Sequence, residues 1–447
     1  MRKPAPMYAA HRARALAALE ARGAAALVFT NTPKTRNHDA EYRFRPDSDF
    51  WWLTGFGEPE SALLLLPARG EKPAKTVLFL RERNRDAEIW SGRRLGVERA
   101  PEHLGIDEAY PIAELDKKLA ELLKGHTKLV YRVGADESRD RIVLGVLSRL
   151  RALARQPEPV PQEVLDPAPL LHELRLFKDE HELDLMRRAA EITAAGHIAA
   201  MKAARDGVGE GEIEALIEYE FRRRGATAPA YGSIVAGGAN ACILHYVEND
   251  QPLRAGDLLL IDAGAEADFY ACDVTRTFPV GGRFSAEQRA LYEVVLQAQH
   301  DAIALSHPGA RFDAVHKRAL RTLVEGLCRL GLLGDTPEVA IEKETYRRFY
   351  MHRTSHWLGL DVHDCGAYVV ERESRTLEPG MVLTIEPGLY IAEDDDTVEP
   401  RWRGIGIRIE DDVLITASGH EILTSAVPKS IADLERICSQ EPRLARV

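Results

Sequence analysis

The junction between a run of apolar residues and an acid, at Asp262, is the feature that most constrains how the chain folds. Residues 258–261 are all apolar, are expected to form a buried strand, and lead directly into Asp262. An ionised carboxylate there is costly unless it is paired with a cation or binds a metal. Gly264 and the small or acidic residues after it predict a turn, with 269–278 as a returning strand. Such a hairpin would bring Asp262 and Asp273 together.

The same pattern recurs further along the chain, in LEPGMVLTIEPG at 377–388. This segment matches 253–264 at a constant offset, with leucine, glycine and isoleucine at equivalent places, and it sets Glu386 where the first segment has Asp262. A repeated unit of turn, buried strand and acid predicts two related halves that face each other, each contributing carboxylates.

The second repeat also has a returning strand, GIGIRIEDDVLIT at 404–416. Its period of two puts three isoleucines on one face and Gly406, Arg408 and Glu410 on the other. Glu410 is then the counterpart of Asp273 in the first repeat. The alternative is a chance similarity between two apolar strands that follow glycine turns, but the shared order of turn, strand and acid favours a duplication.

Composition and charge exclude several classes of protein. The 447 residues, 45% hydrophobic and 29% charged, are typical of a soluble globular chain of two or three domains. A net charge of -11, with no run dense in lysine and arginine, argues against a nucleic-acid partner. The five scattered cysteines predict a reducing compartment without disulfides. Since no apolar run approaches a membrane span and charges interrupt the N-terminal segment, we expect a cytoplasmic protein with no membrane partner.

A Pro-rich stretch, PEPVPQEVLDPAP at 157–169, is the best linker candidate and divides the chain in two. Before it, strand-like runs alternate with helical patterns. The strand candidates are AAALVFTN, DFWWLTGF, SALLLLP, KTVLFL and KLVYRV, and the helices are expected around 8–22, 112–124 and 139–155. This order predicts an α/β N-terminal domain over residues 1–172.

The second part of the chain mixes helices with antiparallel strands. Asp179 and Glu182 form a predicted capping box at the start of a long helix, and further helices are expected at 209–224 and 285–305. We therefore predict an α+β C-terminal catalytic domain over residues 173–447, with the internal duplication inside it.

Histidines gather in YMHRTSHWLGLDVHD, at 350–364, just before the second acidic strand. They are His352, His356 and His363, and a fourth, His245, lies upstream in ACILHYVEN. A single histidine near an aromatic residue is usually structural, but this cluster predicts at least one metal ligand. The chain has no HExxH, which argues against the helix of single-zinc proteases.

The candidate ligands favour two hard or borderline cations. Four carboxylates and one imidazole, without an obvious thiolate, suit Mn²⁺ better than a structural zinc. The carboxylates carry too much charge for one divalent ion and match two. Two such ions can activate a bridging water and stabilise a hydrolytic transition state. A single structural magnesium or calcium is the alternative, but it would not require the histidines.

These residues and motifs resemble the pita-bread metallopeptidases, which include methionine aminopeptidase, prolidase and Xaa-Pro aminopeptidase. The stretches ILHYVEND, LLLIDAGAEADFYACDVTRTFPV, SHWLGLDVHD, LEPGMVLTIEPGLYI and GIGIRIEDDVLIT are similar to bacterial Xaa-Pro aminopeptidases (aminopeptidase P) in particular. RNHDAEYRFRPDSDFWWLTGFGEPES and EIWSGRRLG resemble the N-terminal domain of that group. The resemblance covers nearly the whole chain. It implies a pita-bread fold with a pseudo-two-fold axis, and release of the N-terminal residue from peptides with proline at the second position.

The resemblance also implies a ligand set for two Mn²⁺ ions. Asp262 would bind one ion, His356 and Glu386 the other, and Asp273 and Glu410 would bridge both. A hydroxide that bridges the ions would attack the scissile carbonyl, with Glu386 as the general base. An Xaa-Pro bond has no amide N–H and a locked ring, so it needs a pocket that does not expect an amide donor.

Further residues receive roles by the same matching. His245, His352 and His363 would line the site, where they stabilise the oxyanion, contact the substrate or shape the proline pocket. A second group lies behind the metals or at a subunit contact: Arg408, Tyr390 and Asp39 would form a relay, and Trp90 would reach the site of a neighbouring subunit. The last contact implies a homotetramer.

The chain departs from the family pattern at Arg353, beside His352, where relatives often have glycine; fine specificity therefore does not follow from the resemblance. Three rivals differ in function. Prolidase shares the five ligands but cleaves only dipeptides, and methionine aminopeptidase usually lacks so large an N-terminal domain. Metal-free relatives are peptide-binding or chaperone modules with substituted ligands, whereas all five ligands are present here.

Overall fold

The computed structural model describes residues 6–152 and 158–440, and the chain divides into two compact units. The first unit ends at Arg175 and the second begins at Leu176, whereas the sequence prediction put the boundary between 172 and 173. All five cysteines are free. Within the described residues, no helix combines the length and apolar character that a bilayer crossing needs.

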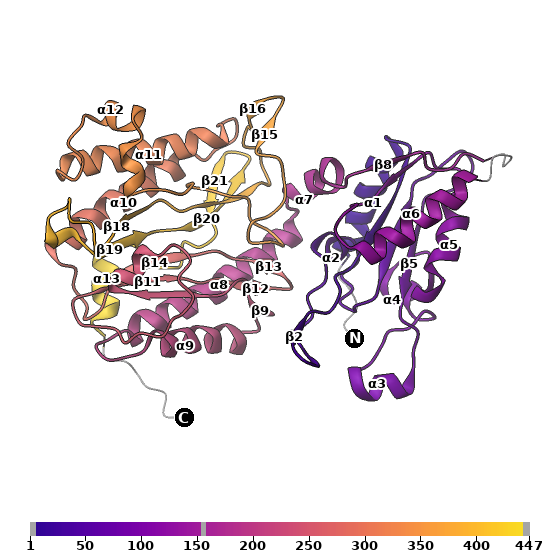
Figure 1. The fold of residues 1–447 in the computed structure, drawn as a ribbon, viewed down its shortest axis with the longest axis horizontal. Coiled ribbons are helices and arrows are strands. Elements are labelled where there is room, and N and C mark those ends of the chain that lie inside the picture. The colour runs from indigo at the N-terminus through magenta and orange to yellow at the C-terminus, as the bar shows by residue number, and fades with distance from the viewer. Residues whose placement is uncertain (1–5, 153–157, 441–447) are drawn as a thin grey trace. The chain divides into compact units, whose positions relative to one another are not determined.

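A six-stranded mixed sheet forms the centre of the first unit, in the order β6-β5-β4-β1-β7-β8 (Figure 1). Its middle strand, β1, pairs antiparallel with β4 and parallel with β7. The strands are β1 (Ala24–Phe29), β4 (Ala62–Leu66), β5 (Lys75–Leu80), β6 (Glu108–Pro111), β7 (Lys128–Val130) and β8 (Glu163–Leu165). Buried apolar side chains of this sheet pack with those of α5 (Leu115–Leu122) and α6 (Glu137–Ala152) in one core.

The remaining elements of the first unit are short, apart from its first helix. They are α1 (Met7–Glu20), β2 (Thr35–Asn37), β3 (Ala40–Glu41), α2 (Ser48–Thr54), α3 (Arg85–Ser91), α4 (Ala100–Leu104), η1 (Ile112–Glu114) and η2 (Ala168–His172), with α7 (Glu173–Leu176) at the boundary. The unit has the α/β character expected from the sequence.

The aromatic run DFWWLTGF is a helix and not the strand that was predicted. Its residues belong to α2, which begins after Asp47, whose side chain accepts a hydrogen bond from the Phe50 N–H. The helix ends at Gly55, which takes the left-handed conformation with φ of 58°. Aromatic residues favour strands, but a capping aspartate and a C-terminal glycine favour a helix, and here the caps prevail.

The Pro-rich stretch 157–169 is part of the first unit and not a linker, as far as it is described; residue 157 lies outside the described residues. Strand β8 lies within this stretch and extends the sheet by pairing in parallel with β7. As the last strand of the sheet, β8 is followed closely by prolines, which are tolerated at a sheet edge.

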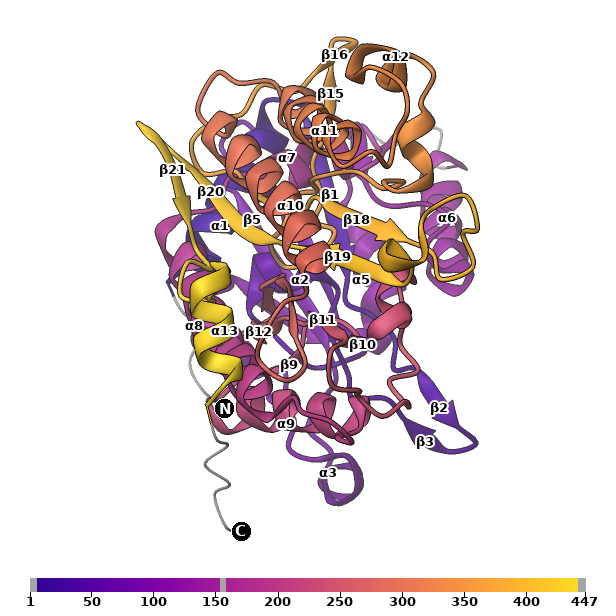
Figure 2. The same ribbon diagram turned by 90° about the vertical axis from the view of Figure 1, so that its left-hand side faces the viewer.

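Two equivalent strand pairs form the centre of the second unit (Figures 1 and 2). In the first, β11 (Leu258–Asp262) pairs antiparallel with β14 (Thr275–Pro279), and in the second, β17 (Val382–Ile385) pairs antiparallel with β20 (Asp411–Thr416). Asp262 is the last residue of β11, and Glu386 directly follows β17. The repeat seen in the sequence is therefore a repeat of structure.

Helices cover these strands. In Figure 1, α8 and α9 lie on the side of β11 and β14, and α10 and α11 lie on the side of β18 and β20. The predicted capping box is present at the start of α8: the Asp179 carboxylate accepts from the Glu182 N–H at 3.0 Å, and the Asp179 N–H donates to the Glu182 carboxylate at 2.9 Å. The helices are α8 (Glu180–Ala203), α9 (Glu210–Arg223), α10 (Ala286–Leu305), α11 (Phe312–Arg329), α12 (Pro337–Glu342) and α13 (Ile431–Cys438).

The first hairpin turns later than predicted. Gly264 is not in a turn; the chain continues through β12 (Ala265–Ala267) and turns at Asp268 and Phe269, which have φ of 46° and 70°. Gly264 is instead required for close packing, because a Cβ there would lie 1.7 Å from the carbonyl oxygen of Cys272. The returning segment is β13 (Tyr270–Ala271) followed by β14, so Asp273 lies between two strands.

The second returning strand is likewise divided. Its first part, β19 (Ile405–Arg408), pairs with β18 (Gly388–Ile391), while its second part, β20, pairs with β17. Glu410 lies in the break directly before β20. The other short elements of this unit are β9 (Ala228–Pro229), β10 (Ile234–Gly237), η3 (Gly238–Cys242), η4 (Thr345–Arg348), β15 (Val369–Val370), β16 (Glu373–Ser374), η5 (Pro400–Trp402) and β21 (Gly419–Ile422).

Candidate active site

Side chains from both repeats line one cavity of 640 Å³ in the second unit. The lining includes the four predicted acidic metal ligands and all four predicted histidines, together with Arg408: Asp262, Asp273, Glu386, Glu410, His245, His352, His356 and His363. The structure therefore brings together residues that lie more than a third of the chain apart.

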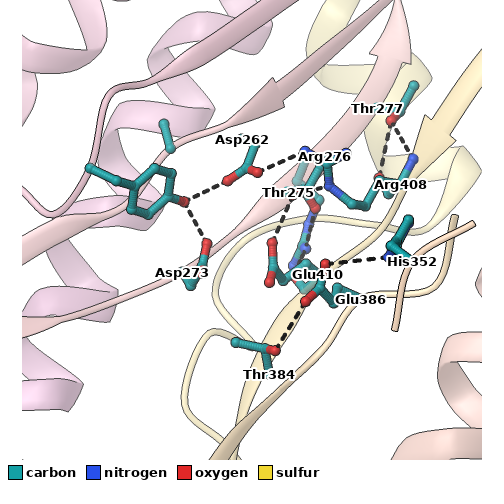
Figure 3. Close-up of polar contacts among 12 residues, drawn as sticks. Asp262, Asp273, Thr275, Arg276, Thr277, His352, Thr384, Glu386, Arg408 and Glu410 are labelled. Carbon is teal, nitrogen blue, oxygen red and sulfur yellow. Dashed lines mark hydrogen bonds and ion pairs between the residues drawn. The ribbon is translucent and has the colours of Figure 1, made fainter. Parts of the chain in front are cut away.

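The two aspartates of the first hairpin share a hydroxyl group. The Tyr231 hydroxyl lies 2.6 Å from Oδ1 of Asp262 and 2.6 Å from Oδ1 of Asp273. On its other side, Asp262 accepts from Nη2 of Arg408 at 2.7 Å (Figure 3). The backbone N–H of Asp273 donates to the Asp412 carboxylate at 3.1 Å. Each aspartate is thus held by partners on two sides.

His356 is oriented by the chain so that one ring nitrogen faces the acids. Its Nδ1 donates to the carbonyl of Trp357 at 3.0 Å, so Nε2 carries the free lone pair of the neutral ring. Nε2 lies 3.4 Å from Oδ2 of Asp273 and 3.6 Å from Oε1 of Glu386. Since a backbone carbonyl can only accept, this assignment of the tautomer follows from the contact itself.

The two glutamates are positioned by threonines. The Thr275 hydroxyl donates to Oε2 of Glu410 at 2.7 Å, and the Thr384 hydroxyl lies 3.4 Å from Oε1 of Glu386 (Figure 3). Ligand atoms of Asp273, His356 and Glu410 all lie within 4.8 Å of one another. This spacing allows one ion to contact all three.

Several acids are buried close together, and this raises the pKa of three of them. Burial raises the pKa of Glu386 to about 7, against the lowering effect of His356. Burial, followed by the charge of Asp273, raises the pKa of Glu410 well above its usual range, and burial also raises the pKa of Asp262. Carboxylates that raise each other's pKa in this way lack sufficient positive charge among the side chains around them.

The donor set fits divalent cations that prefer oxygen ligands. It offers four carboxylates and one imidazole nitrogen with a free lone pair, and none of the cysteines lines the cavity. The excess of negative charge also affects His356. Burial would lower the pKa of its ring, but the hydrogen bond and charge of Asp273 raise it to about 9. Oxygen-rich sites of this kind suit Mn²⁺ or Mg²⁺.

A chain of hydrogen bonds runs behind the acids. Nη1 of Arg408 donates to the Tyr390 hydroxyl at 3.1 Å, and this hydroxyl lies 2.8 Å from Nε2 of His352. Nδ1 of His352 donates to the carbonyl of Arg353 at 2.7 Å, so Nε2 accepts from Tyr390. Burial, helped by the charge of Arg408, lowers the pKa of His352 to about 4. Both nitrogens of the neutral ring are therefore occupied by the protein.

His363 and His245 differ from His352 in this respect. The ring of His363 meets that of His356 edge-on, with centroids 4.4 Å apart, and burial lowers the pKa of His363. His245 is exposed at the cavity. Neither ring makes a hydrogen bond with any residue in the described part of the chain. Their nitrogens therefore remain available to a bound molecule.

Two predicted residues belong to the first unit. Asp39 is exposed in the turn between β2 and β3, and Trp90 is 90% exposed in α3. Neither lines the cavity, which is formed by residues of the second unit alone. Arg408 and Tyr390 are hydrogen-bonded to each other, and the relay that was assigned to them and to Asp39 stays a prediction.

Sequence reasoning missed the uncharged groups that hold the acids, above all Tyr231 and Thr275. It also missed a buried group behind Glu410. Arg276, fully buried, donates to the Glu410 carbonyl and to Oδ1 of Asp411 at 2.7 Å, and Nζ of Lys429 lies 2.6 Å from Oδ2 of Asp411. The consecutive acids of IEDD were a signal for this group, because three charges in an apolar strand require partners.

Comparison with known families accounts for both units. The profile of metallopeptidase family M24 matches residues 184–417, and that of the aminopeptidase P N-terminal domain matches residues 8–131. The predicted fold, an α/β domain followed by a pita-bread domain with a pseudo-two-fold duplication, is thereby confirmed.

Relatives of known name and structure agree along the whole chain. The Xaa-Pro aminopeptidase of Haemophilus influenzae is 49% identical, over 92% of this chain and 93% of the relative, and that of Escherichia coli is 47% identical, over 93% of each. The structure of Pseudomonas aeruginosa aminopeptidase PepP superposes with a TM-score of 0.94 at 46% identity, covering 98% of this chain and 99% of that one. Zinc-substituted E. coli aminopeptidase P, in complex with product, superposes with a TM-score of 0.92 at 45% identity, covering 96% and 98%. The chain belongs to metallopeptidase family M24, within its Xaa-Pro aminopeptidases.

Proposed function

We infer that the protein is a Xaa-Pro aminopeptidase, a hydrolase that removes the N-terminal residue from peptides with proline at the second position. The observation that carries this inference is the convergence of four carboxylates and the Nε2 of His356 on one cavity, in a chain that matches Xaa-Pro aminopeptidases over more than nine tenths of its length. Prolidase is not favoured, because the relatives are named as aminopeptidases and share the N-terminal domain.

The metal centre holds two divalent ions, and Mn²⁺ is the proposed metal. Asp262, Asp273, His356, Glu386 and Glu410 would hold the ions, with Asp262 assigned to one ion, His356 and Glu386 to the other, and Asp273 and Glu410 to both. The close approach of Asp273, His356 and Glu410 supports this division. When bound, the ions would supply Lewis acidity and lower the pKa of a bound water molecule.

The chain's own residues divide the remaining work. Glu386 is the general base: it accepts the proton of the attacking water and returns it to the proline nitrogen that leaves. His363 and His245, whose nitrogens are available, donate to the carbonyl oxygen as negative charge develops on it. His352 has both nitrogens occupied, so its role is to shape the pocket beside Tyr390.

The cysteines and Trp90 support a proposal for the compartment and the oligomeric state of the enzyme. The free cysteines support a reducing compartment such as the cytoplasm. Trp90 supports an oligomer together with the adjacent Ile89, because two large apolar side chains, 90% and 74% exposed, offer a surface that a partner can cover. We assign this contact to a neighbouring subunit of a homotetramer.

Product analysis by mass spectrometry tests the activity. Three substrates are incubated with Mn²⁺ and then with a chelator: an Xaa-Pro-Yaa tripeptide, an Xaa-Pro dipeptide and a Met-Ala peptide. Loss of the first residue from the tripeptide, stopped by the chelator, is the expected result. Cleavage of the dipeptide alone would establish a prolidase, and turnover of none would indicate a peptide-binding module.

Single substitutions test the assigned roles. Glu386→Ala and His356→Ala each remove a metal ligand, and we expect turnover to fall at least about a thousandfold while the circular dichroism spectrum is kept. Glu378→Ala is the matched control, since Glu378 is an exposed acid in the same segment and does not line the cavity. Turnover at the wild-type level in either ligand variant would contradict the assignment.

A further inference from the structure

Two arginines line the cavity, and they differ in their exposure and in their hydrogen-bond partners. Arg408 is 4% exposed and its guanidinium is bound to Asp262, Tyr390 and Thr275. Arg353 is exposed, and its guanidinium has no hydrogen bond or ion pair with any residue that the structure describes. A guanidinium has five N–H donors in a planar fork that matches a carboxylate. Arg353 thus presents an unused carboxylate-binding group to the cavity.

The backbone of Arg353 is fixed although its side chain is exposed. Its carbonyl accepts from Nδ1 of His352 at 2.7 Å. The next residue, Thr354, is fully buried, and its hydroxyl lies 2.8 Å from Nδ1 of His316 and 2.6 Å from the Tyr350 hydroxyl. The positive charge is therefore attached to a rigid part of the cavity wall, close to the histidine cluster.

No acid of the cavity compensates this charge. Asp313 is the acid on the outer wall, and Lys317 of the same helix already forms an ion pair with it. The other acids of the lining belong to the proposed metal centre. A negatively charged group of a substrate would therefore find Arg353 unpaired.

The wall near the mouth of the cavity is apolar and rigid. The rings of Phe312 and Tyr368 have centroids 4.9 Å apart, and Tyr368 stacks on Trp357 at 5.4 Å with an interplanar angle of 5°. The Trp357 N–H also donates to the Tyr368 hydroxyl at 3.0 Å. Beside them, Val369 in β15 is 61% exposed and lines the cavity. This surface suits an apolar side chain that enters from solvent.

The charges of a short peptide define its direction in this cavity. Its N-terminal ammonium is repelled by a guanidinium, and its first peptide bond must lie at the buried acids that we assign as metal ligands. The chain that follows the proline must leave on the exposed side, where Arg353 and Val369 lie. In a tripeptide, this end carries the C-terminal carboxylate.

We propose that Phe312, Tyr368 and Val369 form a subsite for the residue after the proline, and that Arg353 binds the C-terminal carboxylate of a tripeptide substrate. This inference rests on the proposed aminopeptidase activity and adds a preference to it. The enzyme selects Xaa-Pro-Yaa tripeptides with a free carboxylate over the same sequence without that charge.

The test compares Ala-Pro-Leu with Ala-Pro-Leu amide on the Mn²⁺-loaded enzyme, at neutral pH and low salt. We expect kcat/KM to be about fivefold higher for the free carboxylate, as for a charge-assisted contact that is partly exposed to solvent. The difference should lie in KM, because the contact is remote from the scissile bond, and it should shrink as sodium chloride is added.

The variant Arg353→Gln should reduce this ratio to about one. Arg372→Gln is the matched control, since Arg372 is an exposed arginine in the turn of the same β15–β16 hairpin and does not line the cavity; it should keep the wild-type ratio. Thermal unfolding checks that both variants fold.

The outcomes separate the two inferences. Equal kcat/KM for the two peptides in the wild type overturns the proposed subsite and leaves the aminopeptidase activity established. A wild-type ratio that persists in Arg353→Gln removes Arg353 from the subsite. Failure of the wild-type enzyme to release alanine from either peptide overturns the proposed function itself.

Discussion

Tyr231 has one hydroxyl proton and two carboxylate neighbours at the same distance of 2.6 Å. It therefore donates to Asp262 or to Asp273, one at a time. In either case the hydroxyl fixes the spacing of two residues that we assign as metal ligands. Partners of this kind orient ligands and tune their affinity for the metal.

We predict that Tyr231→Phe weakens Mn²⁺ binding by about 10- to 100-fold, because the ring is kept and only the positioning hydroxyl is lost. Calorimetric titration of the metal-free protein with Mn²⁺ measures this directly. Tyr219→Phe on α9 is the control, since the Tyr219 side chain is 62% exposed. Unchanged affinity in Tyr231→Phe would show that the hydroxyl has no role in metal binding.

His356 makes metal binding dependent on pH. In the metal-free protein its pKa is about 9, raised by Asp273 against the effect of burial, so the ring carries a proton at neutral pH. A metal ligand must be neutral imidazole, and binding therefore releases this proton.

The expected sign is that Mn²⁺ affinity rises with pH up to about 9 and falls as the solution becomes more acidic. Titration calorimetry at pH 7.5 in two buffers of different ionisation enthalpy counts the released protons. Equal apparent enthalpies in the two buffers would mean that no proton leaves, which would contradict a protonated His356.

At the level of single residues, the sequence predicted the acids of the cavity and missed the hydroxyl groups of Tyr231 and Thr275 that hold them. Asp262 and Glu410 interrupt apolar strands, and a charge in an apolar strand is visible in the sequence. Tyr231 lies in a segment without clear periodicity, and its hydroxyl becomes significant only when the fold brings it to the acids. Arg353 was visible as a departure from the family pattern, but its lack of a partner was not.

Among the elements, the contact between β14 and β20 joins the two repeats. Arg276 of β14 and Asp411 of β20 form an ion pair with both side chains fully buried. Burial would raise the pKa of Asp411, but the charges of Arg276 and Lys429 lower it to about 2. The carboxylate is therefore ionised throughout the physiological range and stabilises the buried Arg276 and the partly exposed Lys429.

We predict that Asp411→Asn lowers the free energy of unfolding by about 3–5 kcal/mol, because it leaves Arg276 buried without its counter-charge. Urea unfolding, measured with chelator present, gives the value. Asp433→Asn in α13 removes a partner from the exposed pair with Arg436, and we expect it to cost less than about 1 kcal/mol. Similar losses in the two variants would contradict a special role for the buried pair.

Local signals predicted α8 with its capping box, α9, α10 and the strands of both hairpins, and they failed elsewhere. The run that forms α2 has strand propensity and helix caps at once. Helix α11 was not predicted, although Val315, Ala319, Leu323 and Leu327 recur every four residues and are buried. Both cases are decided by burial against neighbours that the sequence does not identify.

Over the whole molecule, each unit has an apolar core of its own, with β1 and β4 in the first and β11 and β14 in the second. All the proposed metal ligands belong to the second unit. A metal that binds the folded state stabilises it by about 2.7 kcal/mol at 100 times its dissociation constant.

We therefore expect Mn²⁺ to slow amide hydrogen exchange in β11, β14, β17 and β20, and to leave exchange in β1 and β4 unchanged. Exchange detected by mass spectrometry, with Mn²⁺ and with chelator, measures both units in one experiment. Equal slowing in the two units would contradict a metal centre confined to residues 176–447.

The repeated motif predicted the arrangement of the second unit, because two copies of one motif imply equivalent hairpins. The extent of the first unit was harder to predict. Prolines at 159, 161 and 167 indicated a linker, yet the same stretch supplies the edge strand β8. This segment is a strand because it pairs with β7, and local composition does not identify the strand with which a segment pairs.

The division of the acids between the repeats bears on how such a protein arises. Asp262 and Asp273 come with the first hairpin and Glu386 and Glu410 with the second, so a gene that encoded one repeat would supply half of a centre. Its product would be complete only as a dimer about a two-fold axis. Two copies that are joined in one chain can differ in sequence. In this protein, His356 accompanies only the second hairpin, and Tyr231 only the first. The two halves of this active site carry different residues, which two identical repeats in a symmetric dimer could not do.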